Sequence, residues 1–334
     1  MIAQQVAVFD ADGHVREDDS IFRYFPEPYY GKQDPYPLFP SLDGFPRPIG
    51  SADLETWKGT LERINAVRAV LYPTAGLAHG LIQDVDYAVA VARAYNDWLE
   101  DTYLSKEPRL LGAALLPAQR PEAAAAEIRR VAARPGFVAG MLPSVLRPQQ
   151  SYGAREFWPI FDAAQETGLP LAVHGGPMVG LGFDHFRSMR VGSGLSHPLA
   201  IFIQMADMVL SGVFEEFPDL RCAYLEAGCG WVPWIMDRLD SKADGRLPRK
   251  PSSYIKDSPG FWFTFEIDEA ASLRDCINRI GADRLMYPSD FPHGNNEFTF
   301  ADELQEFIDD SGFDDGVKSR LLLGNARAFY GVDV

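Results

Sequence analysis

The chain has 334 residues, 46% of them hydrophobic, and its 31 basic and 47 acidic side chains give a formal net charge of −16. A chain of this length and composition forms one large hydrophobic core or two modest ones, and its negative charge argues against nucleic acid and anionic membranes as partners. No apolar run reaches the roughly 18 residues that a membrane span needs, the first residues lack a signal-peptide pattern, and the three cysteines form no Cys-x-x-Cys pair. We therefore expect a cytoplasmic globular protein.

The first predicted strand, residues 6–9, runs into three polar residues, Asp10, Asp12 and His14. Residues two apart on an extended backbone point to the same side, so these side chains can share one face at the carboxyl end of the strand. A carboxylate beside an imidazole is half of a plausible metal site. The alternative is an ordinary turn, which Asp and Gly after a strand also favour.

Residues 16–51 are rich in proline, tyrosine and phenylalanine and form a long irregular connection. Such a connection in a compact protein is usually functional or mobile. We expect this insertion either to cover a pocket as a lid or to pack as a surface flap.

The rest of the chain alternates strand and helix patterns. Further strands are predicted at 68–73, 110–117, 137–143, 169–174, 221–226, 261–266 and 284–289. Helices are predicted at 51–66, with Ser51 as N-cap, and at 84–103, 121–133, 155–167, 198–217, 230–240, 269–280, 300–309 and 316–330. A glycine-rich excursion, residues 175–197, separates the fifth strand from the next helix.

Eight strands joined through helices run parallel, and eight such units close into a single (β/α)8 TIM-type barrel, which would take up residues 1–334 as one domain. A doubly wound open sheet is the alternative, but the segment after the first strand is not the glycine-rich phosphate loop of that fold. In a barrel the carboxyl ends of all strands meet at one mouth, where catalysis occurs. The polar residues at predicted strand ends are Asp12, His14, His174, Glu226, Glu266 and Asp290.

Six short motifs, in this order and spacing, resemble the amidohydrolase-related family, which includes aminocarboxymuconate-semialdehyde decarboxylase and the resorcylate-type decarboxylases. The resemblance covers nearly the whole chain. The motifs are Asp10-Ala11-Asp12-Gly13-His14, Tyr95-Asn96-Asp97-Trp98-Leu99, His174-Gly175-Gly176, Glu226-Ala227-Gly228-Cys229-Gly230-Trp231-Val232-Pro233, Tyr287-Pro288-Ser289-Asp290-Phe291-Pro292-His293 and Leu323-Gly324-Asn325-Ala326.

The resemblance implies one divalent metal ion held by a His-x-His pair on strand one, a histidine on strand five and an aspartate on strand eight. Carried over to this chain, the ligands are Asp12, His14, His174 and Asp290. Asp12 stands where the family has the first histidine, which shifts the preference toward harder ions such as Mn²⁺ or Mg²⁺ and leaves Zn²⁺ possible. Glu226 is a second departure, since the decarboxylases often place a catalytic histidine there.

Three of these residues are candidates for catalysis. Asp290 can bind the metal, carry a proton, or do both, and His174, which the resemblance implies as a ligand, is a further candidate. Glu226 is either a general acid–base group or the partner of an arginine, and Gly228 and Gly230 after it leave room for a ligand or let the backbone turn. The alternative for each residue is a polar side chain satisfied by hydrogen bonds within its loop.

Four further residues are candidates for substrate binding. Arg187 and Arg190 lie in the loop after strand five, where an arginine can grip a carboxylate bidentately, although each alone also fits a solvated loop charge. His293, three residues after Asp290, is placed to orient the site or contact substrate, and Glu266 is equally compatible with a structural salt bridge. His185 and His197 are expected to be loop or capping histidines.

The leading functional hypothesis is a metal-dependent carboxy-lyase acting on a small aromatic or unsaturated carboxylic acid. The same site would also suit a hydrolase of an amide, ester, lactone or activated carbon–carbon bond, with a metal-bound water as nucleophile. A third hypothesis is a barrel that has lost its metal and serves as a binding or scaffold protein. We expect a homo-oligomer, either a dimer or a tetramer.

Overall fold

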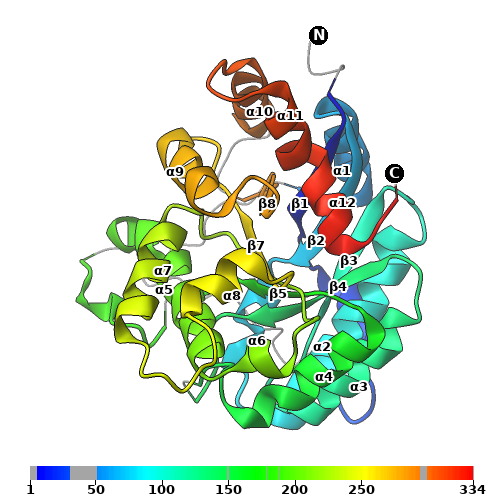
Figure 1. The fold of residues 1–334 in the computed structure, drawn as a ribbon. Coiled ribbons are helices and arrows are strands. Elements are labelled where there is room, and N and C mark those ends of the chain that lie inside the picture. The colour runs from blue at the N-terminus through cyan, green and yellow to red at the C-terminus, as the bar shows by residue number, and fades with distance from the viewer. Residues whose placement is uncertain are drawn as a thin grey trace.

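Eight parallel strands pair in chain order, from β1 beside β2 to β7 beside β8, and helices lie around the outside of this sheet (Figure 1). The computed structural model describes residues 6–30, 51–148, 150–177, 179–187, 189–293 and 299–333. The strands are β1 (Val8–Val15), β2 (Ala66–Pro73), β3 (Leu110–Leu115), β4 (Phe137–Pro143), β5 (Leu171–His174), β6 (Cys222–Leu225), β7 (Phe261–Thr264) and β8 (Leu285–Met286).

Backbone hydrogen bonds between β1 and the segment after β8 close the sheet. The Ala11 N–H donates to the Tyr287 carbonyl at 2.9 Å, and the His14 N–H donates to the Phe291 carbonyl at 2.7 Å. Since the first strand meets the last, the predicted (β/α)8 barrel is confirmed and the open sheet is excluded.

The helices follow the predicted alternation, with Pro251–Asp257 as a short helix that the sequence analysis did not predict. They are α1 (Leu54–Arg63), α2 (Val85–Leu99), α3 (Pro121–Ala132), α4 (Trp158–Thr167), α5 (Met189–Leu210), α6 (Val213–Glu216), α7 (Trp231–Lys242), α8 (Pro251–Asp257), α9 (Ala270–Ile280), α10 (Thr299–Asp309), α11 (Asp315–Ser319) and α12 (Asn325–Tyr330). Among the described helices, none combines the length and the hydropathy that a membrane crossing requires.

Two boundary predictions are wrong. Helix α5 begins at Met189, nine residues before Pro198, so the expected irregular excursion already contains the first turns of a 22-residue helix. A proline inside a helix costs one hydrogen bond, which is why the sequence pattern favoured a start at Pro198. The N-cap of α1 is Asp53, whose carboxylate accepts a hydrogen bond from the Thr56 N–H at 2.8 Å, and not Ser51.

The first part of the expected insertion packs on α2. Residues Asp19–Tyr24 form a short 3₁₀ helix, and Ser20 accepts a hydrogen bond from the indole N–H of the buried Trp98 at 2.8 Å. Phe25 stacks on Tyr87 with ring centroids 5.9 Å apart. Residues 31–50 lie outside the described residues, so the lid or flap role of the segment 16–51 stays a prediction, as does the single-domain boundary.

Strand β1 departs from regular alternation at its polar end. Its pairing with β2 shifts register between Asp10 and Gly13, which places one extra residue in β1. Asp12 and His14 therefore share one face with each other but not with Asp10. The Asp10 carboxylate instead accepts hydrogen bonds from the Ser289 N–H at 2.8 Å and the Ser289 hydroxyl at 2.6 Å.

A close contact with α1 fixes the same end of β1. The Trp57 indole N–H donates to the His14 carbonyl at 3.0 Å. A Cβ on Gly13 would lie 2.3 Å from Cη2 of Trp57, so only glycine permits this approach. The tryptophan, which is fully buried, thus fixes the backbone that carries Asp12 and His14.

Candidate metal centre

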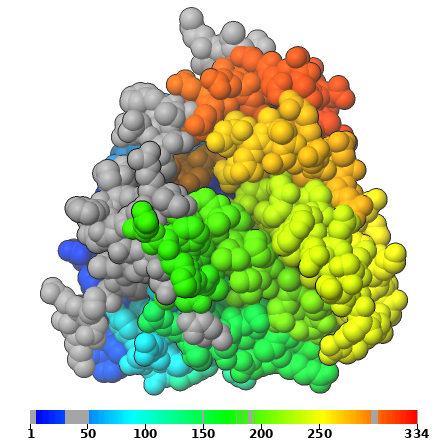
Figure 2. All heavy atoms as spheres, turned by 90° about the vertical axis from the view of Figure 1, so that its left-hand side faces the viewer, coloured from blue at the N-terminus to red at the C-terminus, as the bar shows by residue number. Residues whose placement is uncertain are grey.

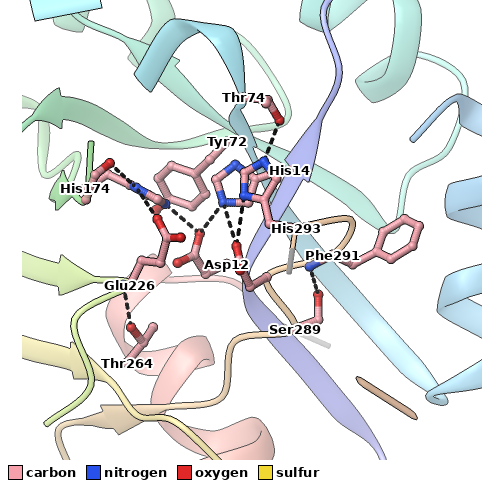
Figure 3. A network of polar contacts seen from close by, with 12 residues as sticks. Asp12, His14, Tyr72, Thr74, His174, Glu226, Thr264, Ser289, Phe291 and His293 are labelled. Atoms are coloured by element: carbon pink, nitrogen blue, oxygen red, sulfur yellow. Dashed lines mark hydrogen bonds and ion pairs between the residues drawn. The ribbon is translucent and has the colours of Figure 1, made fainter. Parts of the chain in front are cut away.

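Four of the polar residues predicted at strand ends, Asp12, His14, His174 and Glu226, lie together at the carboxyl end of the barrel (Figure 3). Asp12 and His14 come from β1, and His174 is the last residue of β5. Glu226 directly follows β6, and Asp290 lies in the segment after β8. Residues far apart in the sequence meet here because parallel strands of a barrel all end on one side.

The three buried residues Asp12, His14 and His174 form the centre of the cluster. His174 Nε2 lies 3.1 Å from Asp12 Oδ1, and His14 Nε2 lies 3.6 Å from the same oxygen. One ligand atom from each of the three residues lies within 4.8 Å of the others. On the open side, Asp290 Oδ1 is 3.4 Å from His14 Nε2.

Both histidines are held with Nε2 toward the centre. His14 Nδ1 is 3.0 Å from the Pro73 carbonyl, and His174 Nδ1 is 3.0 Å from the Gly175 carbonyl. A carbonyl only accepts hydrogen bonds, so these contacts keep the proton on Nδ1 and leave the Nε2 lone pair for a cation.

The donor set fits one divalent cation. Among the residues that the structure describes, Asp12 Oδ2 and His14 Nε2 are buried and have no hydrogen-bond partner. Buried polar atoms are normally satisfied, and two imidazoles with carboxylate oxygens suit Zn²⁺ or Mn²⁺. The group of ligands proposed from the sequence is therefore brought together, with Asp290 at its edge.

Without a bound cation, a proton takes the place of the metal. Burial lowers the pKa of His174, but the Asp12 and Glu226 carboxylates outweigh burial and raise this pKa to about 9. A divalent ion would compete with that proton, so binding of the ion is expected to release it.

Asp290 is held by two histidines. Its Oδ1 lies 3.1 Å from His293 Nδ1, whose other ring nitrogen is 2.9 Å from the Thr74 hydroxyl. Burial raises the pKa of Asp290, but His293 and His14 outweigh burial and hold this pKa well below its ordinary value. The residue has a φ of +50°, a conformation that costs a non-glycine residue energy and is often kept at functional sites.

Glu226 has the same unusual backbone, with a φ of +57°, and its N–H donates to the Thr264 hydroxyl at 3.0 Å. Its Oε2 lies 2.7 Å from His197 Nδ1 and 3.5 Å from His174 Nδ1. The expected loop or capping role of His197 is wrong, because this histidine lies in α5 and pairs with Glu226. No sequence signal marked it, since the start of α5 was not predicted.

A cavity of about 200 Å³ adjoins the cluster. It is lined by Asp12, Glu226, Phe265, Glu266, Ile267, Asp268, Tyr287, Pro288, Ser289, Asp290, His293, Phe300 and Glu303. Figure 2 shows the molecular surface hollowed between the green segment and the gold and orange segments near the C-terminus.

The predicted substrate-binding residues divide into two groups. Glu266 and His293 line the cavity. Arg187 is exposed and is not among the lining residues, so the geometry gives no support to its predicted contact with a substrate. The side chain of Arg190 lies outside the described part of the structure. The sequence analysis did not identify Asp268, Tyr287 and Glu303 as cavity residues, because it considered mainly polar residues at the ends of predicted strands.

Fold and donor set together define a (β/α)8 barrel with a candidate metal-binding cluster at the carboxyl ends of its strands. The chain belongs to the amidohydrolase family, whose sequence model matches residues 10–332.

The chain is similar in sequence to several decarboxylases. The chain is 26% identical over 268 residues to gamma-resorcylate decarboxylase of Polaromonas sp. (strain JS666), which covers 75% of this chain and 78% of the relative. It is 24% identical over 253 residues to 2-amino-3-carboxymuconate-6-semialdehyde decarboxylase of Dictyostelium discoideum, covering 74% of this chain and 68% of the relative.

Solved structures share the fold. An amidohydrolase from Mycobacterium avium subsp. paratuberculosis K-10 superposes with a TM-score of 0.80 at 20% identity and covers 99% of both chains. A dihydroxybenzoic acid decarboxylase from Polaromonas sp. JS666, with bound manganese and the inhibitor 2-nitroresorcinol, superposes with a TM-score of 0.74 at 20% identity, covering 98% of this chain and 96% of that one.

Proposed function

We propose that this protein is a metal-dependent, non-oxidative decarboxylase of a small aromatic or unsaturated carboxylic acid. The observation that carries the proposal is the buried group Asp12, His14 and His174, with Asp290 beside it, opening on a cavity of about 200 Å³. The decarboxylase relatives and the manganese in a structure of the same fold support it.

In this proposal Asp12, His14, His174 and Asp290 hold one Mn²⁺ or Zn²⁺ ion. When bound, the ion supplies Lewis acidity that grips a carboxylate or phenolate oxygen of the substrate. The Nδ1 contacts of His14 and His174 with backbone carbonyls fix both rings in the ligating tautomer.

We assign the proton transfer to Asp290 and its neighbour His293. The 3.1 Å contact between them lets His293 Nδ1 keep a proton available next to Asp290 Oδ1. The proton is delivered to the carbon that bears the carboxylate. The carbon–carbon bond then breaks, its electron pair stays with the substrate, and carbon dioxide leaves. Glu226 with His197 forms a second proton-handling pair on the other side of His174.

Hydrolysis of an amide, ester, lactone or activated carbon–carbon bond is the second candidate, because the family that the chain belongs to is described as amidohydrolase. The two reactions differ in what they consume: decarboxylation releases carbon dioxide, and hydrolysis takes up water. A metal-free scaffold is disfavoured by the unsatisfied Asp12 Oδ2 and His14 Nε2 among the described residues, which would cost stability to bury.

The test has two parts. Elemental analysis of purified protein should find one divalent ion per chain, and the metal-loaded enzyme should release carbon dioxide from at least one member of a panel of hydroxybenzoates and unsaturated acids. Asp290→Asn should abolish release, whereas Asp283→Asn, at a surface position with a 72% exposed side chain, should retain it. Water-dependent cleavage of amides or esters without carbon dioxide release would replace the proposal by the hydrolase.

We also propose that the protein is a cytoplasmic homo-oligomer. All three cysteines are buried and unpaired, which suits a reducing compartment, and cell fractionation tests the location. Large apolar side chains are exposed on α5 and α7, among them Ile203 at 38% and Trp234 at 54%, which favours contact with another copy. Light scattering on the eluted protein measures the oligomeric state.

A further inference from the structure

The cavity beside the metal cluster is strongly acidic. Six of its lining residues are aspartate or glutamate, one is histidine, and none of the described lining residues is lysine or arginine. The cavity carboxylates fall into two sets. Asp12, Glu226 and Asp290 each contact a histidine and belong to the metal cluster. Glu266, Asp268 and Glu303 lie in the remaining part, and we call them the outer acidic set.

Glu266 is the member of this set on which the argument for a ligand depends. Glu266 lines the cavity at the end of β7. Within the described residues its carboxylate makes no hydrogen bond or ion pair. Burial, together with the negative charges of Asp290 and Glu226, raises the pKa of Glu266 to about 8. A cation beside Glu266 would favour its ionised form and so lower this pKa.

Tyr287 supplies a second and independent indication of a ligand. It lines the same cavity and is fully buried, and its phenol oxygen has no hydrogen-bond partner among the residues that the structure describes. A buried hydroxyl without a partner costs free energy, so a ligand group with N–H or O–H donors would be stabilised there.

The spacing of the outer acidic set favours an organic cation over a second metal ion. The described residues contain two groups of three or more ligand atoms within 4.8 Å, and both include His14. Neither group contains Glu266, Asp268 or Glu303. These carboxylates do not converge on one point as metal ligands must, but a substituent with several N–H donors tolerates wider spacing.

We propose that Glu266, Asp268, Glu303 and Tyr287 form a subsite for a protonated amine on the substrate. This inference rests on the proposed function in one respect: the substrate then carries its carboxylate at the metal cluster and its ammonium group at the outer acidic set. A substrate of this kind is a zwitterion, which resolves how an acidic cavity can admit a carboxylic acid. It also removes the need for Arg187, which is not among the lining residues.

The test uses pairs of hydroxybenzoates that differ in one substituent, aminomethyl in one member and hydroxymethyl in the other, placed at each free ring position in turn. With the metal-loaded wild-type enzyme, kcat/KM for carbon dioxide release should favour the aminomethyl member of at least one pair by on the order of tenfold or more, the range of a charge-assisted hydrogen bond. Glu266→Gln should reduce this ratio at least tenfold.

The matched control is Glu306→Gln, because Glu306 is exposed on α10 and does not line the cavity. This variant should keep the wild-type ratio. Equal rates for both members of every pair, or a ratio that Glu266→Gln leaves unchanged, would overturn the subsite. Two metal ions per wild-type chain and one in Glu266→Gln would assign the outer acidic set to a metal instead.

A binding measurement separates this inference from the proposed reaction. If no member of the panel is decarboxylated, the proposed function fails, and calorimetry with benzylamine and benzyl alcohol still tests the subsite. Wild-type protein should bind benzylamine at least tenfold more tightly than the alcohol, and Glu266→Gln should lose that difference. Equal binding of the two compounds would refute the subsite whatever the reaction is.

Discussion

His197 Nδ1 lies 2.7 Å from Glu226 Oε2, so a histidine of α5 is paired with the carboxylate that follows β6. The contact is possible only because residue 175 is glycine, since a Cβ there would lie 2.2 Å from the same ring nitrogen. Burial raises the pKa of Glu226, but His197 and His174 together outweigh burial and lower this pKa below its ordinary value, with His197 contributing the larger part. The pair therefore keeps Glu226 ionised next to His174.

Replacing His197 by alanine should slow catalysis and change its pH dependence. The pKa of Glu226 is held down mainly by His197, so loss of the ring should move the acidic limb of the kcat/KM profile to higher pH. A decrease of on the order of 10²-fold at the optimum is the lower end for losing a group that assists proton transfer. His185→Ala, at an exposed histidine, is the control. An unchanged dependence of kcat/KM on pH would show that the pair of His197 and Glu226 has only a structural role.

Gly13→Ala tests the support of the metal ligands by α1. The added Cβ would meet the Trp57 ring at 2.3 Å, and overpacking of this kind costs about 1–3 kcal/mol of folding free energy. Metal affinity should fall as well, because Asp12 and His14 flank the displaced backbone. Denaturant unfolding and metal titration measure the two effects.

The control for this variant is Gly59→Ala, at an exposed helical position where a Cβ would meet nothing within 4 Å. It should stabilise the protein by about 0.5–1 kcal/mol. Trp57→Phe combined with Gly13→Ala should restore part of the lost affinity by freeing space. No loss of stability in Gly13→Ala alone would show that the ring moves aside freely.

Because His79 is buried in its neutral form, we expect the free energy of unfolding to decrease in mild acid. This histidine is fully buried, its Nε2 donates to the Ala88 carbonyl at 2.8 Å, and burial lowers its pKa to about 4. The unfolded chain therefore binds a proton between about pH 6.5 and pH 4 that the folded protein does not. Neutral His79 therefore contributes fully to the free energy of unfolding above this pH window, and the contribution is lost as the pH falls through the window.

The free energy of unfolding should fall by about 3 kcal/mol between about pH 6.5 and pH 4, because each pH unit of the pKa difference is worth about 1.4 kcal/mol. His79→Gln should flatten the dependence of unfolding free energy on pH in this range, since glutamine can still donate to Ala88 and does not titrate. His185→Gln should leave the curve unchanged, because His185 is exposed. Parallel curves for wild type and His79→Gln would contradict the prediction.

Metal binding should stabilise the folded protein. A ligand that binds only the folded state adds about 2.7 kcal/mol at 100 times its dissociation constant. Thermal unfolding of wild type should therefore occur at higher temperature with Mn²⁺ or Zn²⁺ and at lower temperature after chelation. His14→Ala and Asp12→Ala should lose this metal-dependent increase in Tm, while Asp283→Asn keeps it. An increase that persists in His14→Ala would place the ion elsewhere.

Much of this site could be predicted from the sequence, because the position of a residue at the end of a barrel strand determines which side of the barrel it lies on. Once eight strand–helix units are recognised, the ends of β1, β5, β6 and β8 must lie at one mouth, and His174 and Asp290 follow from that rule. Asp10 was not correctly placed, because a register shift in β1 cannot be read from alternation alone. The bond from Asp10 to Ser289 depends on that local irregularity.

Other parts of the site depend on contacts that no local pattern encodes. The pairing of His197 with Glu226 requires α5 to begin before Pro198. The sequence does not indicate this, because a proline normally predicts a helix start. Tyr287 has the pattern of an ordinary buried strand residue, and its unsatisfied hydroxyl is a property of the packed protein. Arg187 is exposed and is not among the residues that line the cavity, so its predicted contact with a substrate carboxylate stays a prediction.

Hydrogen bonds between β1 and residues near the end of the chain make the candidate metal centre depend on both ends of the sequence. The Asp290 N–H donates to the Asp12 carbonyl at 2.9 Å, and the Tyr330 hydroxyl donates to the Ala11 carbonyl at 2.6 Å. A fragment truncated before the eighth strand lacks Asp290, Tyr330 and both of these hydrogen bonds. We therefore expect such a fragment neither to close the barrel nor to bring the four proposed metal ligands together.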